Sequence, residues 1–135
     1  ALLEHRAGEL MELVTEVHAR GLDLSRFADA VIQEIRDLLA AKLVKDPQTV
    51  LDRPEDEIRA LQERAASLKP AQLERLFEQL CRVADDVARA SHPRFCLEVG
   101  LAALAEAPAA VPIEDLVNSL KRVESQVARG RPAGR

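Results

Sequence analysis

The chain has 135 residues, enough for one domain with a modest core and too few for two ordinary domains. Its formal net charge of −4 argues against a domain whose main task is to grip nucleic-acid phosphates. Its longest apolar run is far short of the ~20 residues that a membrane-spanning helix needs. Aromatic residues make up only 2%, so the core must be built from Leu, Val, Ile and Ala.

The first ten residues, ALLEHRAGEL, are charged and amphipathic, unlike the apolar block of a signal peptide. The two cysteines lie far apart in the sequence and form no CxxC motif. Both observations favour a protein of the reducing cytoplasm.

A first helix is predicted from apolar residues that recur at helical spacing, namely Leu3, Leu10, Leu13, Val14 and Val17. Gly21 should end this helix, because a left-handed residue is favoured at that place. Asp23 can cap a second helix, over roughly residues 24–44.

The second helix carries two apolar stripes. One holds Phe27, Val31, Ile35 and Leu38, and the other holds Ala28, Ile32, Leu39 and Leu43. A helix with two stripes contacts two neighbouring helices, or one neighbour and one partner chain.

Prolines mark the next two helix starts. Pro47 disfavours helix in Asp46, so residues 45–57 are expected to form a loop. Asp52 and Glu55 have the spacing of a capping box, which predicts a third helix beginning there. Pro70 opens a fourth helix with one apolar and one charged face.

The stretch SHPRFCLEVGLAALAEA, residues 91–107, predicts a fifth helix beginning at Pro93. It is apolar on nearly all sides, so we expect it to be the buried central helix of a bundle. Gly100 inside it costs about 1 kcal/mol of helix propensity. The close approach of a neighbouring helix would explain why a glycine stands there.

After a short Ala/Pro connector, residues 107–112, a last helix should extend to residue 128. The sequence therefore predicts an all-α protein, a single bundle of five to six helices with a central apolar helix. Residues 1–128 would form this domain, and residues 129–135, RGRPAGR, a flexible tail or the start of a linker.

Possible chemistry is sparse. His92 and Cys96 are spaced i, i+4, but a zinc site needs three or four ligands, so a helix-cap histidine and a core cysteine are favoured. The same holds for His5 with Glu9, read as surface electrostatics. The motifs GxxxxGK[ST], GxSxG, HExxH and GxGxxG do not occur in the sequence. We expect no catalytic, cofactor-binding or metal-binding residue in this chain.

Four segments in order resemble the collar domain of bacterial DNA polymerase III gamma/tau subunits. They are RGLDLSRFADAVIQEIRDLLAAKLV, LKPAQLERLFEQL, HPRFCLEVGLAAL and VPIEDLVNSLKRVE. The matching features are the Gly-Leu-Asp-Leu turn at 21–24, the Ile-Arg-Asp-Leu-Leu segment at 35–39, and the proline-led starts of three later helices. Lys69 departs from the family, which tends to have a capping serine there, and Gly100 replaces a bulkier small apolar residue.

The resemblance implies a non-catalytic oligomerisation domain of a clamp loader, in which several subunits form a ring that places the sliding clamp on primed DNA. Other gamma/tau subunits and the delta and delta-prime subunits would be its partners, with an accessory replication peptide as a further one. ATP and Mg would bind an AAA+ domain of the parent subunit, not this chain. Neither nucleic acid nor membrane would contact this domain directly.

A ring of subunits needs head-to-tail contacts between two different surfaces. The candidate interface residues are Ile32, Arg36, Leu43, Leu116, Leu120 and Val123. The alternative is that these residues only complete the domain's own core.

Three other functions stay open. A stand-alone helical adaptor would bind a partner peptide or helix in an apolar groove. A small helical enzyme would bring His92, Cys96 or Asp85 together with other polar groups in a pocket. A nucleic-acid-binding domain would show strongly salt-dependent affinity, which the net charge disfavours.

Overall fold

The computed structural model describes residues 2–106 and 113–130, which form six α-helices and one 3-10 helix. They are α1 (Leu2–Ala19), α2 (Leu24–Leu43), the 3-10 helix η1 (Pro47–Thr49), α3 (Glu55–Ala65), α4 (Pro70–Arg89), α5 (Pro93–Glu106) and α6 (Ile113–Ala128). The predicted all-α bundle is confirmed. The connector at 107–112 and most of the predicted tail lie outside the described residues.

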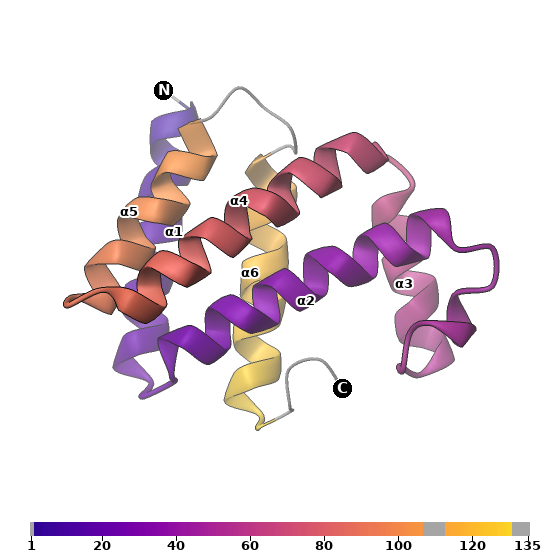
Figure 1. Ribbon diagram of the computed structural model, residues 1–135, viewed down its shortest axis with the longest axis horizontal. Helices are drawn as coiled ribbons and strands as arrows, with labels where there is room; N and C mark the ends of the chain where they lie inside the picture. Colours follow the sequence, from indigo (N-terminus) through magenta and orange to yellow (C-terminus); the bar gives the residue numbers. More distant parts are fainter. Residues whose placement is uncertain (1, 107–112, 131–135) are drawn as a thin grey trace.

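The bundle is elongated, and α2 is its hub (Figure 1). The long helices α2 and α4 lie side by side, and α2 also contacts α3, α5 and α6. The pair α1 and α5 lies at one end of the long axis, whereas α3 and η1 lie at the other. Helix α6 crosses the middle and contacts both α1 and α2.

The helices begin and end largely where local features of the sequence predicted. Gly21 has a φ of +74°, the left-handed conformation that ends α1. The Asp23 side chain accepts a hydrogen bond from the Arg26 backbone N–H at 3.0 Å and so caps α2. At α4, the Gln72 side chain accepts a hydrogen bond from the Lys69 backbone N–H at 2.9 Å, which compensates in part for the missing serine.

The predicted capping box of α3 is wrong. Helix α3 begins at Glu55 with Pro54 in the N-cap position, and that start has no side-chain cap hydrogen bond. Three acidic side chains in the first turn, Glu55, Asp56 and Glu57, favour the helix start through their interaction with the helix dipole instead.

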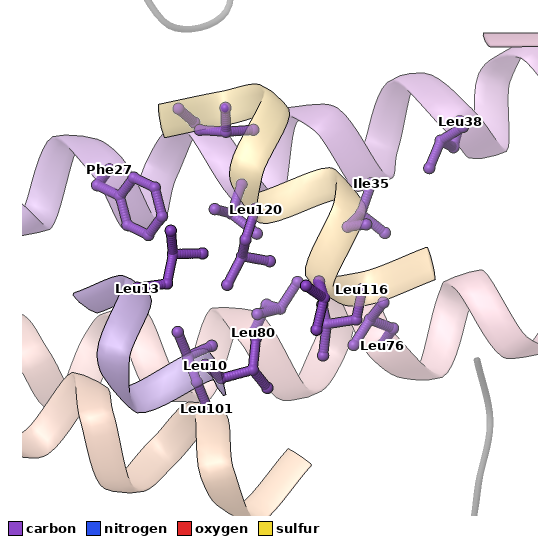
Figure 2. Packing of buried hydrophobic residues seen from close by; sticks show 14 of the residues in the cluster. Leu10, Leu13, Phe27, Ile35, Leu38, Leu76, Leu80, Leu101, Leu116 and Leu120 are labelled. Carbon is purple, nitrogen blue, oxygen red and sulfur yellow. The ribbon is translucent and has the colours of Figure 1, made fainter. Parts of the chain in front are cut away.

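The core is aliphatic, with Phe27 as its one fully buried aromatic side chain among the described residues. Figure 2 shows Leu116 and Leu120 of α6 pointing into the same core as Leu10, Leu76 and Leu80. Helices that are distant in sequence thus share one continuous hydrophobic cluster.

The predicted place of α5 needs correction. One stripe of α5, Leu97, Leu101 and Ala105, is buried against α1 and α4. The opposite stripe is exposed, with Phe95 at 51% and Val99 at 62%. Helix α5 therefore flanks the bundle instead of running through its centre, and α2 occupies the central position.

Gly100 does mark a close approach, as predicted. A Cβ atom at Gly100 would lie 2.9 Å from Cγ1 and 3.2 Å from Cγ2 of Val83. The missing side chain therefore lets α4 and α5 pack closely.

Candidate interaction surfaces

Three of the six predicted interface residues lie in the domain's own core. Leu116, Leu120 and Val123 of α6 are at most 3% exposed and belong to the central hydrophobic cluster. They have no surface to offer a neighbouring subunit while the domain stays folded. For these three residues the structure agrees with the alternative assignment, in which they complete the domain's own core.

The three predicted residues on α2 reach the surface. Ile32 and Arg36 are half-buried, and Leu43 is 57% exposed. The Arg36 guanidinium donates to Asp37 at 2.9 Å. The structure thus keeps α2, and not α6, as the accessible part of the predicted surface.

A second apolar surface was missed by the sequence analysis. It is formed by Phe95, Val99 and Ala103, spaced i, i+4, i+8 along α5, and is called here the α5 face. Apolar residues on all sides of this helix were interpreted as complete burial within the chain. The same pattern is equally expected of a helix that buries one face in its own core and the other in a partner.

Polar groups surround Phe95 at the start of α5. The Arg94 guanidinium lies 5.0 Å from the Phe95 ring centroid, and the His92 ring centroid lies 5.6 Å from it. A hollow of about 370 Å³ adjoins this ring, lined by His18, Leu24, Ser91, His92, Pro93, Arg94 and Phe95. A guanidinium over one face of an exposed aromatic ring stabilises that ring by a cation–π contact.

Another pair of exposed apolar residues lies where α2 runs into η1. Leu43 is 57% exposed and Val50 is 41% exposed. This pair, called here the α2 end, lies at the opposite end of the long axis from α5 (Figure 1). The domain therefore presents apolar side chains at both ends.

A buried ion-pair cluster, which the sequence analysis also missed, joins α2, α3 and α6. Glu34, 1% exposed, accepts hydrogen bonds from Arg53 at 3.0 Å and from Arg64. Asp37, 4% exposed, lies 2.9 Å from Arg53. The Arg122 Nε atom lies 3.8 Å from Glu34.

This cluster is called here the Glu34 cluster. Arg64 also donates to the hydroxyl of buried Ser119, so one guanidinium bridges α2 and α6. Buried charges are tolerated only when they are paired and hydrogen-bonded, and here they are. The two carboxylates stand at the edge of the apolar stripes of α2, which is a signal that they are buried. Apart from Arg36 beside Asp37, their arginine partners come from segments that are distant in the sequence.

The residues considered for metal or thiol chemistry do not converge. Among the described residues, no group of three or more His, Cys, Asp and Glu side chains could hold a metal ion. Burial, with smaller contributions from Asp85 and Asp29, raises the pKa of the Cys81 thiol. Cys81 is therefore a poor thiolate nucleophile.

The His5–Glu9 pair is not a ligand pair either. The carboxylate of Glu9 accepts from Lys121 of α6 at 2.9 Å and from Arg6 at 2.7 Å. The Lys121 hydrogen bond, followed by that of Arg6, lowers the pKa of Glu9. Glu9 thus ties α1 to α6 electrostatically.

The fold and these surfaces define an all-α helical domain, and comparison with known proteins gives its family. Residues 1–120 match the family model of DNA polymerase III subunits gamma and tau, domain III. The chain belongs to this family. No helix within residues 2–106 and 113–130 is long and apolar enough to cross a membrane.

Curated relatives agree with this assignment. The chain is 30% identical over 135 residues to the DNA polymerase III subunit gamma/tau of Mycobacterium bovis and to that of two Mycobacterium tuberculosis strains. Each alignment covers 98% of this chain and 23% of the relative, so the chain spans about a quarter of these proteins. The search of solved structures found no significant match.

Proposed function

We propose that this domain is the non-catalytic oligomerisation domain, or collar, of a clamp-loader subunit. It would hold gamma/tau, delta and delta-prime subunits in a ring, so that AAA+ ATPase domains can load the sliding clamp on primed DNA. ATP and Mg would act in those ATPase domains, and the collar itself would bind no cofactor. Its place of action would be the cytoplasm.

The observation that carries this proposal is the pair of apolar surfaces at opposite ends of the domain. A ring forms by heterologous contact, in which one surface of each subunit meets a different surface of the next. The α5 face, with Phe95 and Val99, and the α2 end, with Leu43 and Val50, are two such different surfaces. We assign the ring contact to these two surfaces, with Ile32 and Arg36 nearer the middle of α2, eleven and seven residues before Leu43.

The hollow next to Phe95 favours one other candidate, an adaptor that binds a partner peptide. Its 370 Å³ could accommodate an apolar side chain of such a peptide against Leu24 and Phe95. An adaptor of this kind has no need of a second apolar surface at the α2 end.

Light scattering over a concentration series from about 1 to 500 μM tests the proposal, since weak contacts have micromolar dissociation constants. We expect the mass to grow with concentration toward a small closed multimer. Val99→Asp should abolish this growth, because it places a charge in the apolar contact. Arg75→Asp, on the exposed face of α4, is the matched control. A strict monomer at the highest concentration, alone and mixed with delta or delta-prime subunits, would favour the adaptor.

A further inference from the structure

A polar hollow of about 310 Å³ lies between the segment that leads into α3, α3 itself and α6. Its described lining consists of Arg53, Glu57, Leu61, Arg122, Ser125, Gln126 and Arg129. It is called here the arginine hollow. It lies next to the Glu34 cluster and shares Arg53 and Arg122 with it.

The charges around the arginine hollow do not balance. The cluster and the hollow together contain four arginines and three carboxylates, namely Arg53, Arg64, Arg122, Arg129, Glu34, Asp37 and Glu57. The domain as a whole carries a net charge of −4. A local excess of guanidinium groups in an acidic domain attracts anions to this place.

The excess lies at the outer edge of the hollow. Arg53 is already held between carboxylates, 3.0 Å from Glu34 and 2.9 Å from Asp37. Among the described residues, Arg122 makes one long ion pair, the 3.8 Å contact with Glu34, and the Arg129 side chain makes none. Donors toward a ligand would therefore come mainly from Arg122 and Arg129.

The spacing on α6 suits a ligand with more than one anionic group. Arg122 of α6 and Arg129, which directly follows this helix and continues its last turn, stand seven residues apart, about 10 Å along the helix axis. Ser125 and Gln126 lie between them in the same lining and add neutral donors. Flexible guanidinium groups at the two ends can each bind one group of an extended anion.

We propose that the arginine hollow binds a small oligophosphate, either inorganic or the phosphate chain of a nucleotide. A lining rich in donors suits phosphate, which has more acceptor oxygens per group than a carboxylate has. Leu61 is the only apolar residue of the described lining, so a nucleobase finds no ring to stack on. The phosphate chain, and not the base, would carry the affinity.

Glu57 opposes this ligand. Its carboxylate belongs to the lining and lies 3.8 Å from Arg53. An anion in the hollow would be repelled by this group, so the removal of its charge should strengthen binding. General attraction to a basic surface would produce a change of the same sign. The Glu57 variant therefore identifies a defined site only when it is measured together with the arginine variants.

Isothermal titration of the 135-residue chain with tripolyphosphate tests the proposal, and Arg129→Gln is the first variant. We expect Arg129→Gln and Arg122→Gln each to weaken binding by about tenfold, the loss of one charge-assisted contact. Glu57→Gln should tighten it. Arg89→Gln is the matched control, since Arg89 is an exposed arginine of α4 paired only with Asp86 in the described chain. Its affinity should equal that of the unaltered chain.

Further ligands identify the source and the chemistry. ATP with the same affinity as tripolyphosphate assigns recognition to the phosphate chain, whereas adenosine should not bind. Equal affinity for citrate and tripolyphosphate, or equal losses in Arg89→Gln and Arg129→Gln, would overturn the proposal. Binding of a single-stranded oligonucleotide without binding of tripolyphosphate would overturn it as well, in favour of a nucleic-acid surface. None of these results depends on whether the domain forms a ring.

Discussion

At the scale of single residues, Gly100 offers the sharpest test of the packing. Gly100→Ala gains about 1 kcal/mol of helix propensity but forces a methyl group to 2.9 Å from Val83. Val83 is branched at Cβ and cannot swing away freely, so overpacking should dominate and lower the free energy of unfolding by about 1 kcal/mol. Chemical denaturation followed by circular dichroism measures this value.

Gly8 provides the matched control for that substitution. It also lies inside a helix, but a Cβ atom there would meet nothing within 4 Å. Gly8→Ala should therefore stabilise the domain by about 0.5–1 kcal/mol. In the Val83→Ala background, Gly100→Ala should lose most of its cost. Stabilisation by Gly100→Ala in the unaltered chain would contradict the close approach of α4 and α5.

The buried carboxyl of Glu124 should make the free energy of unfolding depend on pH. This carboxyl is 5% exposed; burial, then the hydrogen bond and charge of Glu16, raise its pKa, while Arg20 at 3.3 Å acts in the opposite direction. A raised pKa means that the folded chain binds this proton more tightly than the unfolded chain. The stabilisation is therefore complete below about pH 4, near the unfolded pKa, and is lost as the pH rises through the raised pKa.

The substitution Glu124→Gln removes this ionisation. At pH 7 we expect the variant to be more stable than the unaltered chain by about 1 kcal/mol, because no buried charge has to be held. At pH 4 the two chains should differ little. Urea denaturation at both pH values measures the difference, and a less stable variant at pH 7 would show that the Arg20 ion pair outweighs the cost of burial.

At the scale of helices, the Glu34 cluster should respond in the opposite direction. Glu34→Gln keeps the shape of the side chain but leaves Arg53, Arg64 and Arg122 around a neutral group. Removal of one partner from a buried ion-pair cluster costs about 3 kcal/mol. The free energy of unfolding from urea denaturation should fall by about that amount. The change from glutamate to glutamine is thus expected to raise the free energy of unfolding at Glu124 and to lower it at Glu34, because the number of arginine partners differs.

A control for the Glu34 cluster comes from α3. Glu55 and Arg59 form an exposed i, i+4 pair at 4.0 Å. Glu55→Gln should change the free energy of unfolding by at most about 0.5 kcal/mol. A Glu34→Gln effect no larger than this would mean that the cluster is not held as the structure shows it.

The helices also show what sequence reasoning can reach. The end of α1 and the start of α2 were predicted because Gly21 and Asp23 act within a few residues of their own position. The place of α5 was not, because an apolar surface does not reveal whether it is buried by its own chain or by a partner. The α6 stripe was open to both interpretations for the same reason. The Glu34 cluster joins residues up to 88 positions apart, which no local pattern encodes.

At the scale of the whole molecule, the proposed ring predicts how variants of its two surfaces behave alone and when they are mixed. In a heterologous contact the α5 face of one chain meets the α2 end of the next. Val99→Asp should disable the first surface and Leu43→Asp the second, so neither variant should self-associate. Both substitutions are at exposed positions, 62% and 57%, and should leave the fold stable.

A mixture of the two variants should nevertheless associate. The intact α2 end of the Val99→Asp chain can bind the intact α5 face of the Leu43→Asp chain. Their other ends remain blocked, so the complex should stop at one copy of each. Light scattering of the equimolar mixture should therefore give the mass of a dimer, while each variant alone gives that of a monomer. If α5 faces instead met each other in an isologous contact, Leu43→Asp would dimerise by itself and Val99→Asp would add nothing to it.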